Sequence, residues 1–187
     1  MRLFVGIDLP GQIVDNLSRL ISQFRPLAAV RWSRAANLHI TTKFVGEWPE
    51  RRLPEMKEAL RHAAGLGSFR ISLRGLGWFP NPHSPRIFWV GVEAGEELAA
   101  LAAATERATV KLGIPSEDRP YRPHLTLARL QGIGREELIA IRPAVAALES
   151  TDFDTFEAKE FHLYESIMGP GGSIYTKLST YSTTETA

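Results

Sequence analysis

The sequence predicts an α+β fold in which most strands pair antiparallel, and three observations lead to this prediction. Strand-like and helix-like segments are mixed along the 187 residues without the regular strand-helix-strand alternation of a parallel sheet. No linker rich in Gly or Ser divides the chain. Its length also fits one domain of roughly 100 to 200 residues. We therefore expect a single domain over residues 1–187, with a short flexible C-terminal tail at 183–187.

The first half of the chain is expected to run β, α, β, β, α. An apolar strand at residues 2–9 leads into a helix that Pro10 opens, in which apolar residues recur at three- and four-residue spacing. Alternating strands follow at 30–33 and 38–46. A charged amphipathic helix at 49–64 ends at a pair of glycines.

The second half is expected to add more strands than helices. A proline-rich loop at 77–85 separates its first two strands, and a Gly-Pro-Gly-Gly turn at 169–172 separates its last two. The expected strands are 69–76, 86–92, 121–130, 156–166 and 173–181, and the expected helices are 96–112 and 135–148.

The composition excludes several classes of function. Lys and Arg number 22 against 21 for Asp and Glu, so no broad cationic field is available to hold a long polyanion, and any nucleic acid must be bound locally. The chain has no Cys, which excludes disulfides, thiolate metal sites and cysteine nucleophiles. No run of about 18 apolar residues predicts a membrane span. We expect a soluble, cytoplasmic protein.

Two copies of one short motif carry the functional prediction. His39-Ile40-Thr41-Thr42 and His124-Leu125-Thr126-Leu127 both have the form His-x-Thr-x, and both fall on a predicted strand. Side chains two residues apart leave the same face of a strand. Each copy therefore places an imidazole beside a hydroxyl on one face, while Ile40 and Phe44 are expected to point into the core.

Such a pair suits the opening of a cyclic phosphodiester. The reaction needs a base that takes a proton from water and an acid that protonates the leaving sugar oxygen, on opposite sides of phosphorus. Imidazoles with ordinary pKa values near 6.5 can do both, each contributing about 10²- to 10⁴-fold. The hydroxyls of Thr41 and Thr126 can donate hydrogen bonds to the non-bridging oxygens. No metal is required.

One copy alone would be explained as an ordinary half-exposed strand, because Thr is a good strand former. Two copies at matching strand positions make that explanation much weaker. The other histidines, His62, His83 and His162, lack the pattern, and we expect them to be surface or packing residues.

At these residues the chain resembles the two-histidine (2H) phosphoesterase superfamily, and within it the bacterial and archaeal RNA 2′,3′-cyclic phosphodiesterases, first described as 2′-5′ RNA ligases. The similarity extends to the opening segment 2–10, to the blocks 30–47 and 122–129 around the motifs, and to a closing hairpin with Leu163-Tyr164-Glu165-Ser166 and Tyr175. Thr42 stands where many relatives have an aliphatic residue, and we expect it to face inward and alter only packing.

The resemblance implies a fold and a reaction. The fold would have two pseudo-symmetric lobes built from duplicated β-α-β units, with antiparallel sheets around a central cleft. The reaction would hydrolyse the 2′,3′-cyclic phosphate at an RNA end to a 2′-phosphate, with His39 as the proton donor and His124 as the proton acceptor. No cofactor or metal is implied, and we expect a monomer. The residues themselves leave the acid and base assignment open, because the two motifs are nearly equivalent.

Three further residues are candidates for substrate binding. Lys43 shares strand parity with His39 and could meet phosphate at the cleft rim. Arg129 has the opposite parity to His124, so a phosphate contact would need a twist or a bulge. Phe79, in the proline-rich loop, could stack on the terminal base. For Lys43 and Phe79 an ordinary surface or core role is an equally simple explanation.

Alternatives remain open at this point. A 2′-5′ RNA ligase would use the same site with an RNA 5′-hydroxyl as the attacking group, and small cyclic nucleotides or ADP-ribose cyclic phosphate are other substrates of the same class. A non-catalytic module that binds RNA ends would keep the cleft without turnover, although both histidines are intact. A metal hydrolase is disfavoured because the chain has no His-x-His or His-x-x-x-His pair and no Cys.

Overall fold

A computed structural model describes residues 1–130, 135–170 and 172–184 of the chain. Its strands are β1 (Arg2–Asp8), β2 (Arg31–Trp32), β3 (His39–Glu47), β4 (Phe69–Phe79), β5 (Ile87–Ala94), β6 (His124–Arg129), β7 (Asp152–Ala158), β8 (Glu160–Gly169) and β9 (Gly172–Ser182). Its helices are α1 (Gly11–Phe24), α2 (Leu53–Arg61), α3 (Glu96–Val110) and α4 (Arg135–Ala146).

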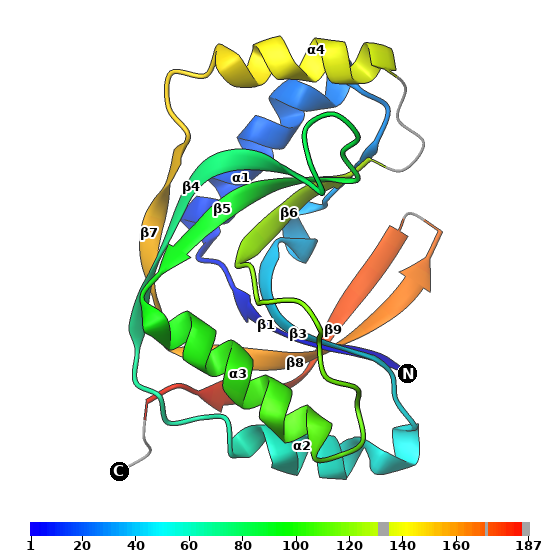
Figure 1. The fold of residues 1–187 in the computed structure, drawn as a ribbon, viewed down its shortest axis with the longest axis vertical. Coiled ribbons are helices and arrows are strands. Elements are labelled where there is room, and N and C mark those ends of the chain that lie inside the picture. Colours follow the sequence, from blue (N-terminus) through cyan, green and yellow to red (C-terminus); the bar gives the residue numbers. More distant parts are fainter. Residues whose placement is uncertain (131–134, 171, 185–187) are drawn as a thin grey trace.

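The strands form two antiparallel sheets. A four-stranded sheet has the order β3-β1-β8-β9, and a five-stranded sheet has the order β2-β6-β5-β4-β7. Figure 1 shows the five-stranded sheet with α1 and α4 in the upper half of the view, and the four-stranded sheet with α2 and α3 in the lower half. The predicted α+β fold with two antiparallel lobes is confirmed.

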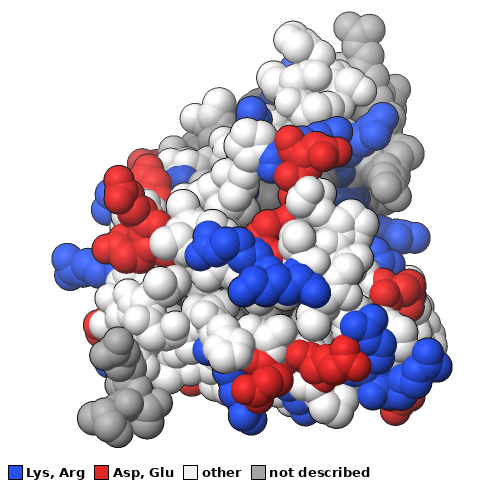
Figure 2. Space-filling model, turned by 60° about the horizontal axis from the view of Figure 1, so that its bottom comes forward, with Lys and Arg blue, Asp and Glu red and all other residues white. Residues whose placement is uncertain are grey.

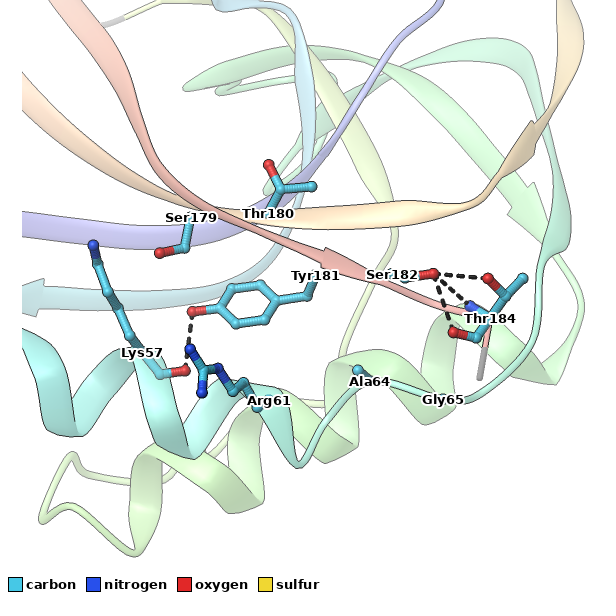
Figure 3. A pocket seen from close by; sticks show the side chains of 9 residues that line it. All are labelled: Lys57, Arg61, Ala64, Gly65, Ser179, Thr180, Tyr181, Ser182 and Thr184. Carbon is cyan, nitrogen blue, oxygen red and sulfur yellow. Dashed lines mark hydrogen bonds between the residues drawn. The ribbon is translucent and has the colours of Figure 1, made fainter. Parts of the chain in front are cut away.

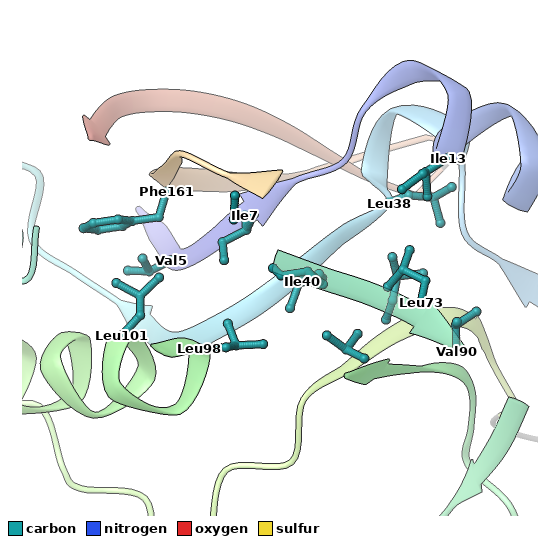
Figure 4. Packing of buried hydrophobic residues seen from close by; sticks show 14 of the residues in the cluster. Val5, Ile7, Ile13, Leu38, Ile40, Leu73, Val90, Leu98, Leu101 and Phe161 are labelled. Carbon is teal, nitrogen blue, oxygen red and sulfur yellow. The ribbon is translucent and has the colours of Figure 1, made fainter. Parts of the chain in front are cut away.

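Each sheet is covered by a helix that follows a strand of the other sheet. Helix α1 follows β1, yet it packs on the five-stranded sheet, where the ring centroid of Phe24 lies 6.1 Å from that of Phe88. Helix α3 follows β5, yet it packs against β3, where Leu98 and Leu101 join Ile40 in one buried cluster (Figure 4). Because neither sheet covers its own apolar face, the two lobes depend on each other to bury it.

The two lobes repeat one β-α-β unit. The unit β1-α1-β3 places the first motif strand beside β1, and the unit β5-α3-β6 places the second motif strand beside β5. Both motif histidines begin their strands, since β3 starts at His39 and β6 starts at His124. The duplication that the resemblance implied is therefore visible in the order of the strands.

Several element boundaries differ from the prediction. The helix expected at 49–64 begins as a 3₁₀ turn, Glu50–Arg52, and becomes α2 only at Leu53. Pro54 lies in the first turn of α2, where its missing N–H would have had no partner within the helix. The strand expected at 156–166 is two strands, β7 and β8, which Lys159 separates and which belong to different sheets. Strand β4 runs to Phe79, so the loop expected from residue 77 begins at Pro80.

Both motif strands contain a bulge, so their side chains do not alternate between the two faces as they would on a straight strand. In the pairing of β1 with β3, Gly6 lies opposite Thr41 and Val5 opposite Lys43, so Thr42 has no partner. In the pairing of β5 with β6, Trp89 lies opposite Thr126 and Phe88 opposite Ala128, so Leu127 is skipped. An unpaired residue shifts the alternation of side chains by one position. Residues beyond each bulge therefore exchange faces.

This exchange corrects two expectations in the first motif. Lys43 is 3% exposed and lies inside the protein, where its Nζ is 2.6 Å from Oε2 of Glu106 on α3. It is not at the rim of the motif side, as the sequence suggested. Phe44 was expected in the core, but it is 55% exposed. Thr42 is buried, as expected.

Thr183, the first residue of the predicted tail, is held in the fold. Thr183 is buried, and its backbone N–H donates to the carbonyl of Lys159 at 2.8 Å. Its own carbonyl accepts from the N–H of Gly67 at 2.6 Å. These bonds hold the chain beyond β9 against the start of β8. Residues 185–187 lie outside the described part of the chain.

None of the helices in the described segments has the length and apolar character that a bilayer crossing needs.

Replacing Lys43 with Ala is expected to lower the free energy of unfolding by about 2 kcal/mol or more, because the carboxylate of Glu106 loses its partner in a mostly buried pair. Chemical denaturation measures the change. Lys111→Ala, an exposed lysine just after α3, is the control and should change stability by about 0.5 kcal/mol or less. Equal effects of the two substitutions would contradict a structural role for Lys43.

Candidate active site

The two motif histidines lie near each other, although they belong to different sheets. Strand β3 is the edge of the four-stranded sheet and contacts β6 of the five-stranded sheet. The positive charge of His124 lowers the pKa of His39, and the positive charge of Arg129 lowers the pKa of both histidines. Charges act in this way only over short distances. We call the face of each sheet that carries its motif histidine the motif face.

Each histidine is held through the same atom. Nδ1 of His39 lies 2.7 Å from the carbonyl oxygen of Asn37, and Nδ1 of His124 lies 2.7 Å from the carbonyl oxygen of Arg122. A carbonyl oxygen only accepts hydrogen bonds, so Nδ1 carries a proton in both rings. In the neutral ring, Nε2 then presents a lone pair, and in the charged ring it presents a proton. Both rings are thus fixed to exchange protons through Nε2.

The threonines of the two motifs differ in their contacts. In the first motif, Nε2 of His39 lies 2.9 Å from Oγ1 of Thr41. Thr126 holds the matching place in the second motif, two residues after His124 and opposite Trp89. Both threonines are partly exposed. The hydroxyl of Thr41 therefore contacts His39, and Thr126 shares the face of its strand with His124.

Two hydrogen bonds tie the motif strands together in a reciprocal way. Oγ of Ser33, which precedes the first motif, donates to the carbonyl of Thr126 at 2.8 Å. The hydroxyl of Tyr121, which precedes the second motif, donates to the carbonyl of Thr41 at 2.9 Å. Each motif threonine thus accepts, at its backbone, a bond from the chain that leads into the other motif. This exchange fixes the relative positions of β3 and β6.

Burial lowers the pKa of both histidines below the ordinary value. For His39, the loss of hydration is the main cause, while the hydrogen bond to Asn37 and the charge of Asp8 act in the opposite direction. For His124, the loss of hydration again dominates, and only the hydrogen bond to Arg122 raises the pKa. Both rings are therefore predominantly neutral at neutral pH in the unliganded protein.

A polar cluster lies next to His39, centred on Asp8. Asp8 pairs with His39 in the register of β1 and β3. Its carboxylate accepts hydrogen bonds from the hydroxyl of Tyr164 and, at 2.6 Å, from Nζ of Lys177. Nε2 of His162, which is buried, lies 3.5 Å from Oδ2 of Asp8. These groups hold a carboxylate beside one histidine, and among the described residues no carboxylate acts in this way on His124.

Aromatic rings surround both imidazoles. The ring of His39 lies 4.7 Å from Phe4 and, edge to face, 5.2 Å from Tyr175. The ring of His124 lies edge to face at 5.0 Å from Phe79, and Phe79 in turn lies 5.0 Å from Trp89. These apolar neighbours remove water from the rings, which explains why burial dominates their pKa values.

Two glycines leave room for these rings. A Cβ on Gly6 would come within 2.9 Å of the carbonyl oxygen of Ile40 and 3.2 Å of Cδ2 of His39. A Cβ on Gly77 would lie 2.1 Å from the indole of Trp89. A larger residue at either position would displace a ring of the site.

The predicted site residues are thus largely brought together. His39, Thr41, His124 and Thr126 stand at the junction of β3 and β6, and Phe79 lies against His124. The bulge at Leu127 turns Arg129 to the motif face, which the sequence named as the condition for its role.

Lys43 is the exception, because it is paired inside the fold. Sequence reasoning missed Asp8, Tyr164 and Trp89 as neighbours of the histidines. Asp8 carried a usable signal, since it is the one charged residue in an apolar strand between Leu3 and Leu9.

Other surface features do not compete with this site. A groove of about 650 Å³ lies between α2 and β9, where the hydroxyl of Tyr181 donates to the carbonyl of Lys57 at 3.1 Å (Figure 3). Tyr181 stacks on the buried Phe161, which is on the opposite side of the sheet from His162 and the motif face. The groove contains no histidine.

Charge is mixed on the face shown in Figure 2, where basic and acidic side chains lie side by side. This agrees with the nearly balanced composition of the chain. Within the described residues, no three His, Asp or Glu side chains gather as metal ligands would.

Comparison with known proteins gives a family for the chain. A sequence model of the LigT-like phosphoesterases matches it twice, over residues 7–89 and 90–175. An RNA 2′,3′-cyclic phosphodiesterase of Archaeoglobus fulgidus is 34% identical over 181 residues, covering 97% of this chain and 99% of the relative. A protein of the same name from Thermotoga maritima is 30% identical and covers 95% of this chain and 93% of the relative.

Solved structures agree with this match. The crystal structure of TT0787 of Thermus thermophilus has a TM-score of 0.82 at 31% identity, with 100% of both chains covered. The crystal structure of E. coli LigT complexed with 3′-AMP has a TM-score of 0.79 at 25% identity, with 98% of both chains covered. The first match of the family model includes α1 and β3, and the second includes α3 and β6, so each match contains one of the two motif strands.

Replacing Asp8 with Asn is expected to lower the pKa of His39 further. The carboxylate stabilises the charged imidazole, so its removal favours the neutral form and shifts the titration of His39 to lower pH. NMR titration of the histidine side chains measures this. Asp15→Asn, an exposed residue on α1, is the control and should leave His39 unchanged. An unchanged or raised pKa of His39 in the Asp8 variant would show that the cluster does not act on the motif.

Proposed function

Because the chain belongs to the LigT-like phosphoesterase family, we propose that it hydrolyses RNA 2′,3′-cyclic phosphate ends to 2′-phosphomonoesters. The observation that carries this proposal is the pair of imidazoles held through Nδ1 by backbone carbonyls, close enough for the charge of one to affect the other. A cyclic phosphodiester placed between them would meet one proton donor and one proton acceptor.

The proposed step conserves atoms and charge with these two residues alone. His124, in its neutral form, takes a proton from water as the water oxygen attacks phosphorus. The bond from phosphorus to O3′ breaks, and His39, in its charged form, gives a proton to O3′. The product carries a 2′-phosphate and a free 3′-hydroxyl. Afterwards His124 is charged and His39 is neutral, and exchange with solvent restores the starting forms.

The hydroxyls and Arg129 would stabilise the phosphate. Thr41 and Thr126 stand beside the two imidazoles, where each hydroxyl can donate to a non-bridging oxygen as negative charge develops. Arg129 supports this role, because its charge already acts on both histidines from the motif face. A guanidinium offers two parallel donors to a phosphate. Phe79, whose ring lies against His124, would contact the terminal nucleotide.

An asymmetry in the site supports the assignment of roles. The charge of Asp8 opposes the lowering of the pKa of His39, and within the described part of the chain no carboxylate does so for His124. His39 is therefore the ring that a neighbouring charge helps to keep its proton, as a donor must. The bound substrate would add to this effect, since the anionic phosphodiester favours the charged form of an imidazole beside it. In the complex, the anionic substrate thereby offsets the lowering of the histidine pKa values that desolvation causes in the unliganded protein.

Some features of the proposal stay predictions. These are the monomeric state, the cytoplasmic location and the independence from metal.

His39→Ala and His124→Ala are each expected to lower kcat by at least 100-fold on an oligoribonucleotide ending in 2′,3′-cyclic phosphate, because each removes one proton transfer. Release of the 2′-phosphate product, followed by chromatography, measures turnover. His62→Ala, an exposed histidine after α2, is the matched control and should retain activity. Thermal unfolding verifies that both motif variants are folded.

The wild-type protein is expected to keep its activity in the presence of a strong chelator. Near wild-type kcat in either folded motif variant would overturn the mechanism. Loss of activity with the chelator, restored by added metal, would overturn its independence from metal.

A further inference from the structure

A short strand places a second arginine directly beside Arg129. Strand β2 consists of Arg31 and Trp32, and it pairs with the end of β6 so that Arg31 lies opposite Arg129 and Trp32 opposite Ala128. Ala128 is buried, and the indole of Trp32 packs edge to face on the buried Phe88 at 6.3 Å. Residues opposite each other in a sheet share a face, and the next pair takes the other face. Arg31 and Arg129 therefore both lie on the motif face.

This pairing is unfavourable unless an anion binds to it. Like charges directly opposite each other on neighbouring strands destabilise a sheet. Arg31 and Arg129 are both exposed, and in the described part of the chain neither has a carboxylate oxygen within ion-pair distance. Other arginines at comparable positions do, since Arg74 on β4 lies 3.0 Å from Asp152 on β7. The pair on β2 and β6 thus has two guanidinium groups on one face, and no described carboxylate forms an ion pair with either of them.

The positions of the two arginines define which anion each would bind. The charge of Arg129 reaches both histidines, so Arg129 is placed for the phosphate that reacts. Arg31 lies one strand further out, about 4.8 Å away across the sheet. That step is of the same order as the spacing between successive phosphates of an RNA strand. A guanidinium binds a phosphate through two parallel N–H groups.

We propose that Arg31 binds the internucleotide phosphate that precedes the terminal nucleotide, and so makes an RNA chain a better substrate than a small cyclic nucleotide. This inference rests on the proposed function, since it names the substrate class of the same site. It gives β2 a role beyond closing the edge of the sheet. Trp32 anchors the strand in the core, and Arg31 extends the binding surface by one phosphate.

The test compares two substrates, of which only one has an internucleotide phosphate. One is a nucleoside 2′,3′-cyclic monophosphate, and the other is a dinucleotide that ends in 2′,3′-cyclic phosphate. Arg31→Ala is expected to lower kcat/KM for the dinucleotide by about 10-fold or more, as for a lost charged hydrogen bond, and to lower it by less than about threefold for the mononucleotide. Arg31→Lys should fall between wild type and Arg31→Ala.

A dinucleotide with an uncharged methylphosphonate linkage gives an independent measurement. The wild-type protein should lose about as much kcat/KM on this substrate as Arg31→Ala loses on the normal dinucleotide, and Arg31→Ala should lose little more. Arg19→Ala is the control for net charge, because Arg19 is exposed on α1, which packs on the side of the five-stranded sheet away from the motif face. It should behave as wild type on both substrates.

Equal losses on both normal substrates, or no loss on either, would overturn the proposal for Arg31. Activity of Arg31→Ala on the mononucleotide also reports that this variant is folded. Failure of the proposed function looks different, because the wild-type protein would then hydrolyse neither substrate.

Discussion

The structure depends on the reciprocal hydrogen bonds by which the chain leading into each motif holds the other motif. Ser33 binds the carbonyl of Thr126, and Tyr121 binds the carbonyl of Thr41. Both acceptors belong to the threonines of the two motifs, so these bonds position the residues of the proposed site and not only the strands. The crossed helices act in the same sense, because α1 and α3 each cover the sheet of the other repeat. Two copies of one unit thereby form a single site.

Much of this could be predicted from the sequence because it depends on local periodicity. The apolar spacing predicted α1 and α3, and the motif residues predicted the two strands that carry the site. The limit of this reasoning lies at the bulges. The residue types of Thr42 and Leu127 do not predict that these positions are unpaired, since a bulge arises from the pairing of two strands far apart in sequence. The effect of the two bulges is large, because the one at Thr42 buries Lys43 and the one at Leu127 turns Arg129 to the motif face.

The neighbours of the histidines could not be predicted from the sequence either, because they also depend on how distant strands pair. Asp8, Tyr164 and Lys177 come from three strands, and only the sheet order β3-β1-β8-β9 brings them together beside His39. The residues that the structure describes form no such cluster beside His124, so this one distinguishes two motifs that are nearly equivalent in sequence. Duplication supplied the symmetry of the site, and the long-range contacts of the first repeat supplied the difference that acid and base roles need.

In the proposed mechanism both imidazoles converge on one phosphorus. A crystal structure of the protein with a nucleoside 2′-phosphate, the proposed type of product, tests this most directly. We expect Nε2 of His39 and Nε2 of His124 both to lie within hydrogen-bond distance of the same phosphate group, on opposite sides of it. A phosphate bound to only one of the two rings, or bound away from both, would contradict the mechanism.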